Sequence, residues 1–408
     1  MAKIFHGGRT WPAGDFLFHS AFKRLGSITE LAIPVWNNGT ALVKQGQEVA
    51  AHSAVGADAH GLPVFTPLAG KVSAVKDFAE LAVRPRRFNI GRLTIQIAVG
   101  EKAAAEPAPV FKPHPRYWEL TKDELTNRLH AAGVIDLKNR PLPKTIVFDG
   151  LDPEPPLSTN LRLLMERPAE LLDGMRIVMQ IHGAVRARLA VPDDQPALFR
   201  QLKSMLASSV NLHPIAVENR YPARHPALLA ACIGLPGNSA IYGMETALRI
   251  KQAVMEGRPL TAKFVTVWDE WSQRRANIEL PIGATVEQAL GLKSESYDGY
   301  KIALGGMLSG ACAHSVKTPV GRDIDGILLI DAAREPRKAP CFNCGQCLEA
   351  CPAGLAPSQI FRMERDSDAA RLVPGACLGC GLCSYICPAG LDLSHQMRIA
   401  RNRTAEAG

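Results

Sequence analysis

The sequence lacks an apolar run long enough to cross a membrane, which takes about 20 consecutive residues. Its longest uncharged stretch, Pro226 to Met244, is interrupted by glycine, proline, asparagine and serine. The opening residues, MAKIFHGGRT, contain no apolar segment of signal-peptide length. We therefore expect a protein that does not span a membrane by itself and that does not enter an oxidising compartment, where disulfides form.

Cysteine is concentrated in one stretch, because eight of the ten cysteines fall between Cys341 and Cys387. This stretch contains the pattern C-x2-C-x2-C-x3-C-P twice, at residues 341–352 and 377–388. Aligned from their first cysteines, the two copies agree at 11 of 22 positions, so they form an internal repeat. In bacterial-type ferredoxins with this spacing, three thiolates of each motif bind one [4Fe-4S] cluster and the fourth binds the neighbouring cluster.

The spacing predicts two [4Fe-4S] clusters with crossed ligands. The first ligand set is Cys341, Cys344, Cys347 and Cys387, and the second ligand set is Cys377, Cys380, Cys383 and Cys351. Gly345, Gly379 and Gly381 are expected to let the backbone turn tightly around the sulfur atoms. Structural zinc fits less well, because it usually takes widely separated C-x2-C pairs. Disulfides fit less well because they need an oxidising compartment.

Two cysteines lie outside the motifs. Cys232 is in an apolar run, and we expect a packed thiol there. Cys312 follows a Gly-rich turn, where we expect a small buried residue, with a reactive thiol as the alternative. We assign no catalytic residue, and no cofactor-binding residue beyond the eight motif cysteines.

The charge of the chain does not favour a nucleic-acid partner. The formal net charge is +8 with the cysteines counted as neutral. Eight thiolates on two cluster cores of charge 2+ would lower it to about +4, and no RNA- or DNA-binding motif accompanies the excess. The composition, 47% hydrophobic and 21% charged, is that of a globular protein. A chain of 408 residues is long enough for roughly two to four domains.

Residues 1–101 read as short apolar strands separated by turn signals, which predicts a small β-rich sandwich or barrel like the biotinyl and lipoyl hammerhead. The expected hairpin tip, Gly56 to Gly61, contains no lysine, so it cannot carry a tethered cofactor and the domain is expected to be structural. Residues 102–115 are rich in alanine and proline, which predicts a linker.

Residues 116–260 alternate between strand and helix patterns, which predicts a mostly parallel sheet covered by helices. The expected strands are 144–148, 186–191 and 215–218, and the expected helices are 161–182, with Pro168 near an interruption, and 197–207. Residues 261–335 are predicted to form a small domain of strands with a short helix. Residues 336–408 form the module that carries the cysteine motifs.

The order of these segments resembles the RnfC family, the peripheral subunits of ion-translocating ferredoxin:NAD oxidoreductase complexes of the Rnf type. The resemblance rests on the opening His6-Gly7-Gly8, PVFTPLAGKVSAV, ETALRIKQAVMEGRPLTAKFVTV, the PIG turn, KIALGGMLSG, DGILLI and the two cysteine motifs. It implies a multidomain α/β protein with a β-rich barrel-sandwich hybrid (hammerhead) and an α/β domain resembling the flavin subunit of complex I. A small ubiquitin-like SLBB-type domain and a C-terminal α-helical dicluster ferredoxin module would follow.

The chain departs from this family at the flavin loop. The family binds FMN and nicotinamide on a loop of the form G-x-G-G-A-G-F-P-T, whereas residues 132–143 here read AGVIDLKNRPLP. Pro141 and Pro143 donate no N–H, and the side chains of residues 137–140 would occupy the space that a phosphate needs. We therefore expect that FMN is not bound tightly. Asp152 and Glu154 keep an acidic pair of the family, either as functional groups or as helix-capping and turn residues.

These features predict an iron-sulfur electron-transfer subunit of an oxidoreductase complex. As the resemblance implies, its partners would be other subunits, possibly membrane-embedded, with ferredoxin or another redox protein as electron donor or acceptor. Its location would be cytoplasmic, peripheral on the inner face of the cell membrane. The alternative is an FMN-containing, NADH-oxidising subunit of an Rnf-type complex, or a related cobalamin reductase.

Overall fold

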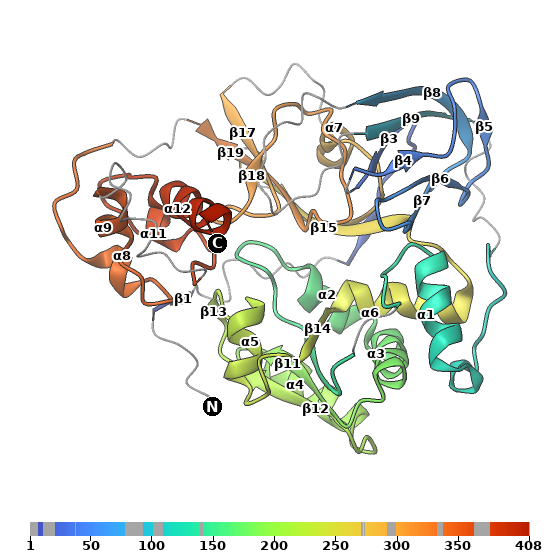
Figure 1. Ribbon diagram of the computed structural model, residues 1–408, viewed down its shortest axis with the longest axis horizontal. Coiled ribbons are helices and arrows are strands. Elements are labelled where there is room, and N and C mark those ends of the chain that lie inside the picture. The colour runs from blue at the N-terminus through green and yellow to red at the C-terminus, as the bar shows by residue number, and fades with distance from the viewer. Residues whose placement is uncertain are drawn as a thin grey trace.

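The computed structural model describes residues 7–10, 21–36, 38–77, 93–100, 109–138, 142–270, 272, 274–291, 299–332, 338–362 and 376–407. In Figure 1, the blue strands between residues 30 and 99 and the red helices of the C-terminal module lie on opposite sides of the molecule. A further sheet, in orange, lies between them, and the green α/β unit lies below. Most of the predicted linker, residues 102–108, and residues 139–141 of the predicted flavin loop lie outside the described residues.

The N-terminal β unit contains two antiparallel sheets. The first has the order β3 (Glu30–Val35), β9 (Leu93–Val99), β8 (Gly70–Asp77), β5 (Glu48–Val49), and the second has the order β4 (Thr40–Ala41), β6 (Ala54–Ala57), β7 (Pro63–Phe65). Ile33 and Ile95 from the first sheet share one buried cluster with Val55 and Val64 from the second. The turn predicted at residues 56–61 connects β6 to β7, and there Asp58 accepts hydrogen bonds from the backbone of His60 and Leu62.

The α/β unit is a parallel four-stranded sheet with helices, as the sequence predicts. Its strand order is β12 (Leu212–Val217), β11 (Arg186–Pro192), β10 (Thr145–Asp149), β14 (Ala240–Gly243). The helices are α1 (Lys122–Ala131), α2 (Thr159–Glu166), α3 (Pro168–His182), α4 (Pro196–Met205), α5 (Pro226–Cys232) and α6 (Met244–Lys251). A 3-10 turn, Tyr117–Glu119, precedes α1, and a π-helical turn, Gln252–Glu256, continues α6.

The single helix expected at residues 161–182 is two helices. Pro168 is the first residue of α3, where a fixed φ and a missing N–H are tolerated, so the interruption predicted near Pro168 is a complete break. The C-terminal end of α3 is Gly183, which has a left-handed backbone with φ of 56°.

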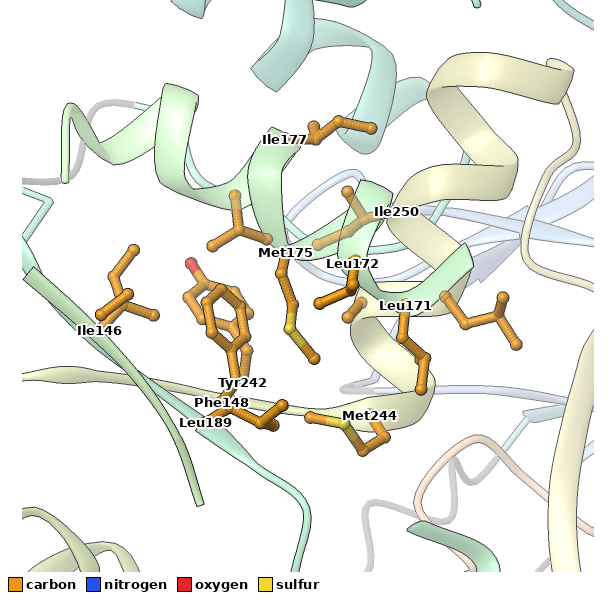
Figure 2. Packing of buried hydrophobic residues seen from close by; sticks show 14 of the residues in the cluster. Ile146, Phe148, Leu171, Leu172, Met175, Ile177, Leu189, Tyr242, Met244 and Ile250 are labelled. Carbon is orange, nitrogen blue, oxygen red and sulfur yellow. The ribbon is translucent and has the colours of Figure 1, made fainter. Parts of the chain in front are cut away.

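The core of the α/β unit lies between the sheet and helices α3 and α6, as Figure 2 shows. Ile146 and Phe148 of β10 are fully buried, and so are Met175 of α3 and Met244 of α6. The two helices approach closely at Gly174, because a methyl group there would overlap the carbonyl oxygen of Ala247. A small residue at this position therefore sets the distance between α3 and α6.

The third unit is a six-stranded sheet. Its order is β18 (Ala311–Cys312), β17 (Tyr300–Leu304), β19 (Gly326–Asp331), β15 (Ala262–Asp269), β16 (Arg274–Pro281), β2 (Lys23–Arg24), and it carries helix α7 (Val286–Leu290). The short strand β1 (Arg9–Thr10) pairs with β13 (Arg220–Tyr221) of the α/β unit. Strands β1 and β2, which precede the β unit in the sequence, therefore belong to sheets of the later units.

The cysteine module is helical. It contains α8 (Gln346–Glu349), α9 (Pro357–Arg362), α11 (Leu382–Tyr385) and α12 (Leu393–Ala407). No helix in the described ranges has both the length and the apolarity needed to cross a membrane.

We predict that Gly174→Ala lowers the free energy of unfolding by about 2 kcal/mol, because overpacking forces α3 away from α6. Urea denaturation followed by circular dichroism measures the effect. Gly237→Ala is the matched control, because a methyl group at Gly237 meets no atom within 4 Å, and its effect should stay within about 0.5 kcal/mol. Equal stability of the two variants would contradict the close packing of α3 on α6.

Candidate metal centre

The two cysteine motifs fold in the same way. In each, a glycine in the left-handed region, Gly345 with φ of 79° or Gly381 with φ of 80°, precedes a four-residue helix, α8 or α11. Only a residue without Cβ adopts this conformation at little cost. Gly379 also has a positive φ, of 65°. The tight turns predicted at these three glycines are therefore present, and the sequence repeat is also a backbone repeat.

The last cysteine of each motif occupies an equivalent turn after its helix. The N–H of Cys351 donates to the carbonyl of Leu348 and that of Cys387 to the carbonyl of Ser384, both at 3.2 Å. Each cysteine carbonyl in turn accepts from a glycine three residues later, Gly354 or Gly390. These turns direct the chain away from its own motif.

The second ligand set lines one cavity. Cys351 of the first motif lies there with Cys377, Cys380 and Cys383 of the second. The apolar side chains of Leu355, Leu382 and Met397 complete much of the wall. The fourth cysteine of the first motif is thus beside the first three of the second, as crossed ligation requires.

The first ligand set lies nearer the surface. Cys344 is exposed, Cys341 and Cys387 are partly buried, and Cys347 is buried. A backbone hydrogen bond of 2.9 Å from Ala339 to Ala389 joins the segment before the first motif to the segment after the second. It places two neighbouring segments, one leading to Cys341 and one leaving Cys387, side by side.

Across the described ranges, no three His, Cys, Asp or Glu side chains are arranged to hold a metal ion. Each thiolate of a [4Fe-4S] cluster binds a different iron, so the ligands of a cluster stand around a core and need not converge on one ion.

The two ligand sets have different electrostatic surroundings. Burial raises the pKa of Cys380 to about 11 and also raises the pKa of Cys377 and of Cys383. The backbone N–H of Asn343, followed by the Arg362 side chain, lowers the pKa of Cys341. The second set is therefore the drier one, and in the first set the surroundings of Cys341 favour its thiolate.

The α/β unit contacts the second ligand set directly. The hydroxyl of Tyr221 donates a hydrogen bond of 2.6 Å to the carbonyl of Cys380, although the two residues are 159 positions apart. The backbone N–H of Gly8 donates to the carbonyl of Ala350 at 3.1 Å, and β1, which follows Gly8, pairs with the strand that holds Tyr221. Sequence reasoning missed Tyr221, because nothing in its local sequence indicates so distant a partner.

Glu154 connects the α/β unit to the six-stranded sheet. Its carboxylate is 2% exposed and accepts hydrogen bonds from the backbone N–H of Leu308, at 2.6 Å, and from both the N–H and the hydroxyl of Ser309. Gly306 has no room for a side chain, because a Cβ there would overlap Glu154. A Cβ at Gly381 would overlap the carbonyl of Leu308. Glu154 therefore positions the loop against which the second motif packs.

Asp152 caps the start of helix α2, which is one of the two roles that the sequence suggested for this residue. Its Oδ1 accepts a hydrogen bond of 2.8 Å from the N–H of Asn160, in the first turn of α2. Burial raises the pKa of Asp152 to about 7, against the opposing effect of this hydrogen bond and of Arg224.

The two cysteines outside the motifs differ from each other. Cys232 is 3% exposed and packs in an apolar cluster, as predicted. Cys312 is exposed on strand β18, so the expectation of a buried residue there is wrong. Strand β18 is the edge of its sheet, and the side chain at this position faces solvent.

Two clefts lie near the carboxyl ends of the parallel strands, where open α/β sheets bind ligands. One, lined by Asp152, Glu154 and Tyr221 among others, has a volume of only about 70 Å³. The other has a volume of about 340 Å³ and begins at Gly243, before α6. It contains four cations, and each of them is paired with a carboxylate: Arg224 with Asp149, Lys263 with Glu245 and Asp325, Arg249 with Glu279, and Arg322 with Asp323.

Two segments of the chain match known family models. Residues 340–391 match the 4Fe-4S dicluster domain, and residues 131–237 match the Nuo51 FMN-binding domain. The chain is also similar to a solved NAD+-reducing [NiFe]-hydrogenase, with a TM-score of 0.48 and 17% identity over 72% of this chain and 65% of that one.

Several relatives are named as the C subunit of an ion-translocating oxidoreductase complex. The protein from Erwinia tasmaniensis is 28% identical, over 76% of this chain and 41% of its own length. The protein from Rhodobacter capsulatus is 27% identical, over 78% and 64%, and that from Haemophilus influenzae 23%, over 81% and 53%. The chain thus spans 41% to 64% of the length of these relatives.

The fold and the cysteine repeat define an iron-sulfur protein of mixed α/β architecture, in which a dicluster module is joined to a unit similar to the Nuo51 FMN-binding domain. Within that class, the relatives confirm the resemblance to the RnfC family.

Crossed ligation can be tested with single cysteine variants. We predict that Cys351→Ala changes the spectrum of the reduced protein in the same way as Cys380→Ala, because both residues line one cavity. Electron paramagnetic resonance of the two variants, with Cys344→Ala as the reference for the other cluster, measures this. A spectrum of Cys351→Ala that matched Cys344→Ala would contradict the crossing.

The raised pKa of Asp152 gives a pH prediction. The unfolded chain ionises this group near the ordinary pKa of 3.8 and the folded chain near a pKa of about 7. The stability that the protonated group contributes is therefore lost as the pH rises from about 4 to about 7. Asp152→Asn keeps an acceptor for α2 and removes the titration, so its stability relative to the natural chain should rise between about pH 5 and about pH 8.

Urea denaturation at both pH values measures the difference for Asp152→Asn. Asp123→Asn, at an exposed position on α1, is the matched control. A stability difference that stayed constant with pH for Asp152→Asn would show that this carboxyl does not titrate in the range.

Proposed function

We propose that this chain is an iron-sulfur electron-transfer subunit of an oxidoreductase complex, and that it relays electrons through two [4Fe-4S] clusters held by the two crossed ligand sets. The observation that carries the proposal is the cavity that Cys351 shares with Cys377, Cys380 and Cys383. When bound, the clusters supply one-electron chemistry, and burial and backbone N–H groups tune their potentials. The N–H of Gly379, which donates to Cys377, is one such group.

The two clusters would have different neighbours. The second ligand set adjoins the α/β unit through Tyr221. The first set lies beside the exposed apolar side chains of Phe342 and Leu348, which are 62% and 45% exposed. We infer that a redox partner binds near the first cluster, and that the second cluster lies farther from this partner and exchanges electrons through the first.

The names of the relatives support a place in a multi-subunit, ion-translocating oxidoreductase complex. The proposed partners are therefore other subunits of such a complex, possibly membrane-embedded, together with ferredoxin or another redox protein as donor or acceptor. The proposed location is cytoplasmic, peripheral on the inner face of the cell membrane.

The proposed domains are a barrel-sandwich hybrid at residues 1–101, a linker at 102–115 and an α/β flavin-type domain at 116–260. An SLBB-like, ubiquitin-like domain at 261–335 and the dicluster module at 336–408 complete the chain. Supporting features are the two antiparallel sheets of the β unit with a shared core, and the six-stranded sheet carrying the short helix α7.

We further propose that the α/β unit does not bind FMN tightly. The cleft beside Glu154 has a volume of about 70 Å³, far below the roughly 300 Å³ of the smallest typical small-molecule pockets. In the cleft of about 340 Å³ that begins at Gly243, a phosphate would meet Glu245, Asp323 and Asp325. It would compete with these carboxylates for cations that are already paired. Glu154 is a candidate flavin neighbour, but its carboxylate is already hydrogen-bonded to Leu308 and Ser309 of the loop.

The second candidate function is that of an FMN-containing, NADH-oxidising subunit or a related cobalamin reductase. The match of residues 131–237 to the Nuo51 FMN-binding domain favours it. In that case the α/β unit would have to open the small cleft and release Glu154 from the loop.

Anaerobic purification of the full chain with iron, sulfide and flavin analysis distinguishes the two functions. We expect about eight irons and eight sulfides per chain and no stoichiometric FMN. Cys312→Ala, outside the motifs, is the control and should leave the iron content unchanged. Zinc in place of iron would refute the relay, and one FMN per chain would establish the second candidate.

A further inference from the structure

A separate cleft of about 640 Å³ lies where three units of the chain meet. The β unit contributes residues around His52, Leu68 and Val99, the end of α6 and the following turn contribute Arg249 and Arg258, and the six-stranded sheet contributes residues 279–281. The volume is within the roughly 300–1,000 Å³ typical of small-molecule sites, which often lie between domains. Neither of the two cysteine ligand sets is part of it.

Positive charge dominates the polar lining of this cleft. Among the described lining residues, three are arginines, Arg24, Arg249 and Arg258, and one is a carboxylate, Glu279. Arg249 is paired with Glu279 at 3.2 Å and with Glu245, outside the lining, at 3.3 Å. Arg258 also contacts Glu256, outside the lining, at 3.3 Å. Arg24 is exposed at the end of β2, and within the described part of the chain it has no ion pair. In the part of the lining that the structure describes, arginines therefore outnumber carboxylates by two. Arg249 and Arg258 are held by carboxylates, and Arg24 is the charge that a phosphate monoester meets there without displacing an ion pair.

Two buried nitrogen atoms in the lining have no hydrogen-bond partner among the described residues. They are Nδ1 of His52, a side chain that is 9% exposed, and Nε of Arg249, which is 6% exposed. His52 has a left-handed backbone with φ of 62°, a conformation that non-glycine residues seldom adopt. Buried polar atoms are rarely left unpaired. Because these two have almost no exposed surface, their side chains must shift slightly before a ligand or an ordered water in the cleft can bond to them.

The rest of the lining is apolar. The partly exposed side chains of Leu25, Ile28, Leu68 and Val99 give the cleft an apolar surface for a hydrocarbon or aromatic body next to the arginines. A bare phosphate would leave this surface in contact with water.

We propose that this cleft binds an organic phosphate monoester, with the phosphate on Arg24, Arg258 and His52 and a compact apolar body against Ile28 and Leu68. Arginine is suited to this task because its planar group donates two parallel hydrogen bonds to phosphate oxygens. A ligand bound here contacts all three units and so fixes the β unit on the rest of the chain. The monoester is either a free metabolite or the headgroup of a lipid, because both present the same chemistry.

Isothermal titration calorimetry of the full, anaerobically prepared chain tests the proposal with phenyl phosphate and inorganic phosphate as probes. The natural chain should bind one phenyl phosphate, more tightly than inorganic phosphate. The double variant Arg24→Gln/Arg258→Gln should raise the Kd for phenyl phosphate at least tenfold. Arg186→Gln/Arg200→Gln removes two exposed arginines of the α/β unit and is the matched control, which should bind as the natural chain does.

A second variant tests the buried partner. His52→Asn keeps a residue type that tolerates the left-handed backbone and shortens the side chain, so it should also weaken phenyl phosphate binding. Unchanged affinity in the Arg24→Gln/Arg258→Gln variant, or equal affinity for phenyl phosphate and inorganic phosphate, would overturn the proposal.

Vesicles separate the two sources of the monoester. Sedimentation with vesicles that contain phosphatidic acid, lost in the Arg24→Gln/Arg258→Gln variant and absent with phosphatidylcholine alone, identifies a lipid headgroup. Binding of phenyl phosphate without such sedimentation identifies a free phosphate ester. Binding of neither probe overturns the site.

Discussion

The arrangement of the functional parts depends on one buried carboxylate, that of Glu154. Glu154 is 2% exposed, and its carboxylate accepts hydrogen bonds from the backbone N–H groups of Leu308 and Ser309 and from the Ser309 hydroxyl. A buried charge is tolerated only when it is fully bonded, so the α/β unit and the loop at residues 306–309 are held in one relative position. The backbone of that loop packs directly on Gly381, in the second cysteine motif. Through these contacts, and through the hydrogen bond from Tyr221 to Cys380, the cysteine module is fixed on the α/β unit.

This arrangement gives the two halves of the cysteine repeat unequal environments. The second ligand set is enclosed by Leu355, Leu382 and Met397 and is tied to the interior, whereas the first set includes the exposed Cys344. Burial and hydrogen bonds to sulfur change cluster potentials, so the proposed clusters on two motifs of the same cysteine spacing would hold electrons at different energies. The cleft of about 640 Å³ between the β unit and the other units shares no residue with the cavity of the second ligand set.

The sequence predicted what depends on local pattern and missed what depends on distant contacts. The cysteine spacing indicated the repeat, and Gly345 and Gly381 have the positive φ that the tight turns need. The parallel sheet followed from the alternation of strands and helices, whereas Pro168 began a new helix where one interrupted helix was expected. Tyr221, the loop held by Glu154 and the charged cleft near His52 bring together residues far apart in the chain. Cys312 was misjudged because a short edge strand cannot be distinguished from a buried turn by composition.

We propose that the chain relays electrons through two clusters and does not itself oxidise NADH. Electron paramagnetic resonance of the anaerobic full chain, reduced in one sample with dithionite and in another with NADH, tests this proposal. We expect the signals of two interacting reduced clusters after dithionite and no cluster signal after NADH. Cluster signals after NADH alone would contradict it, because they would require a functional flavin site in the α/β unit.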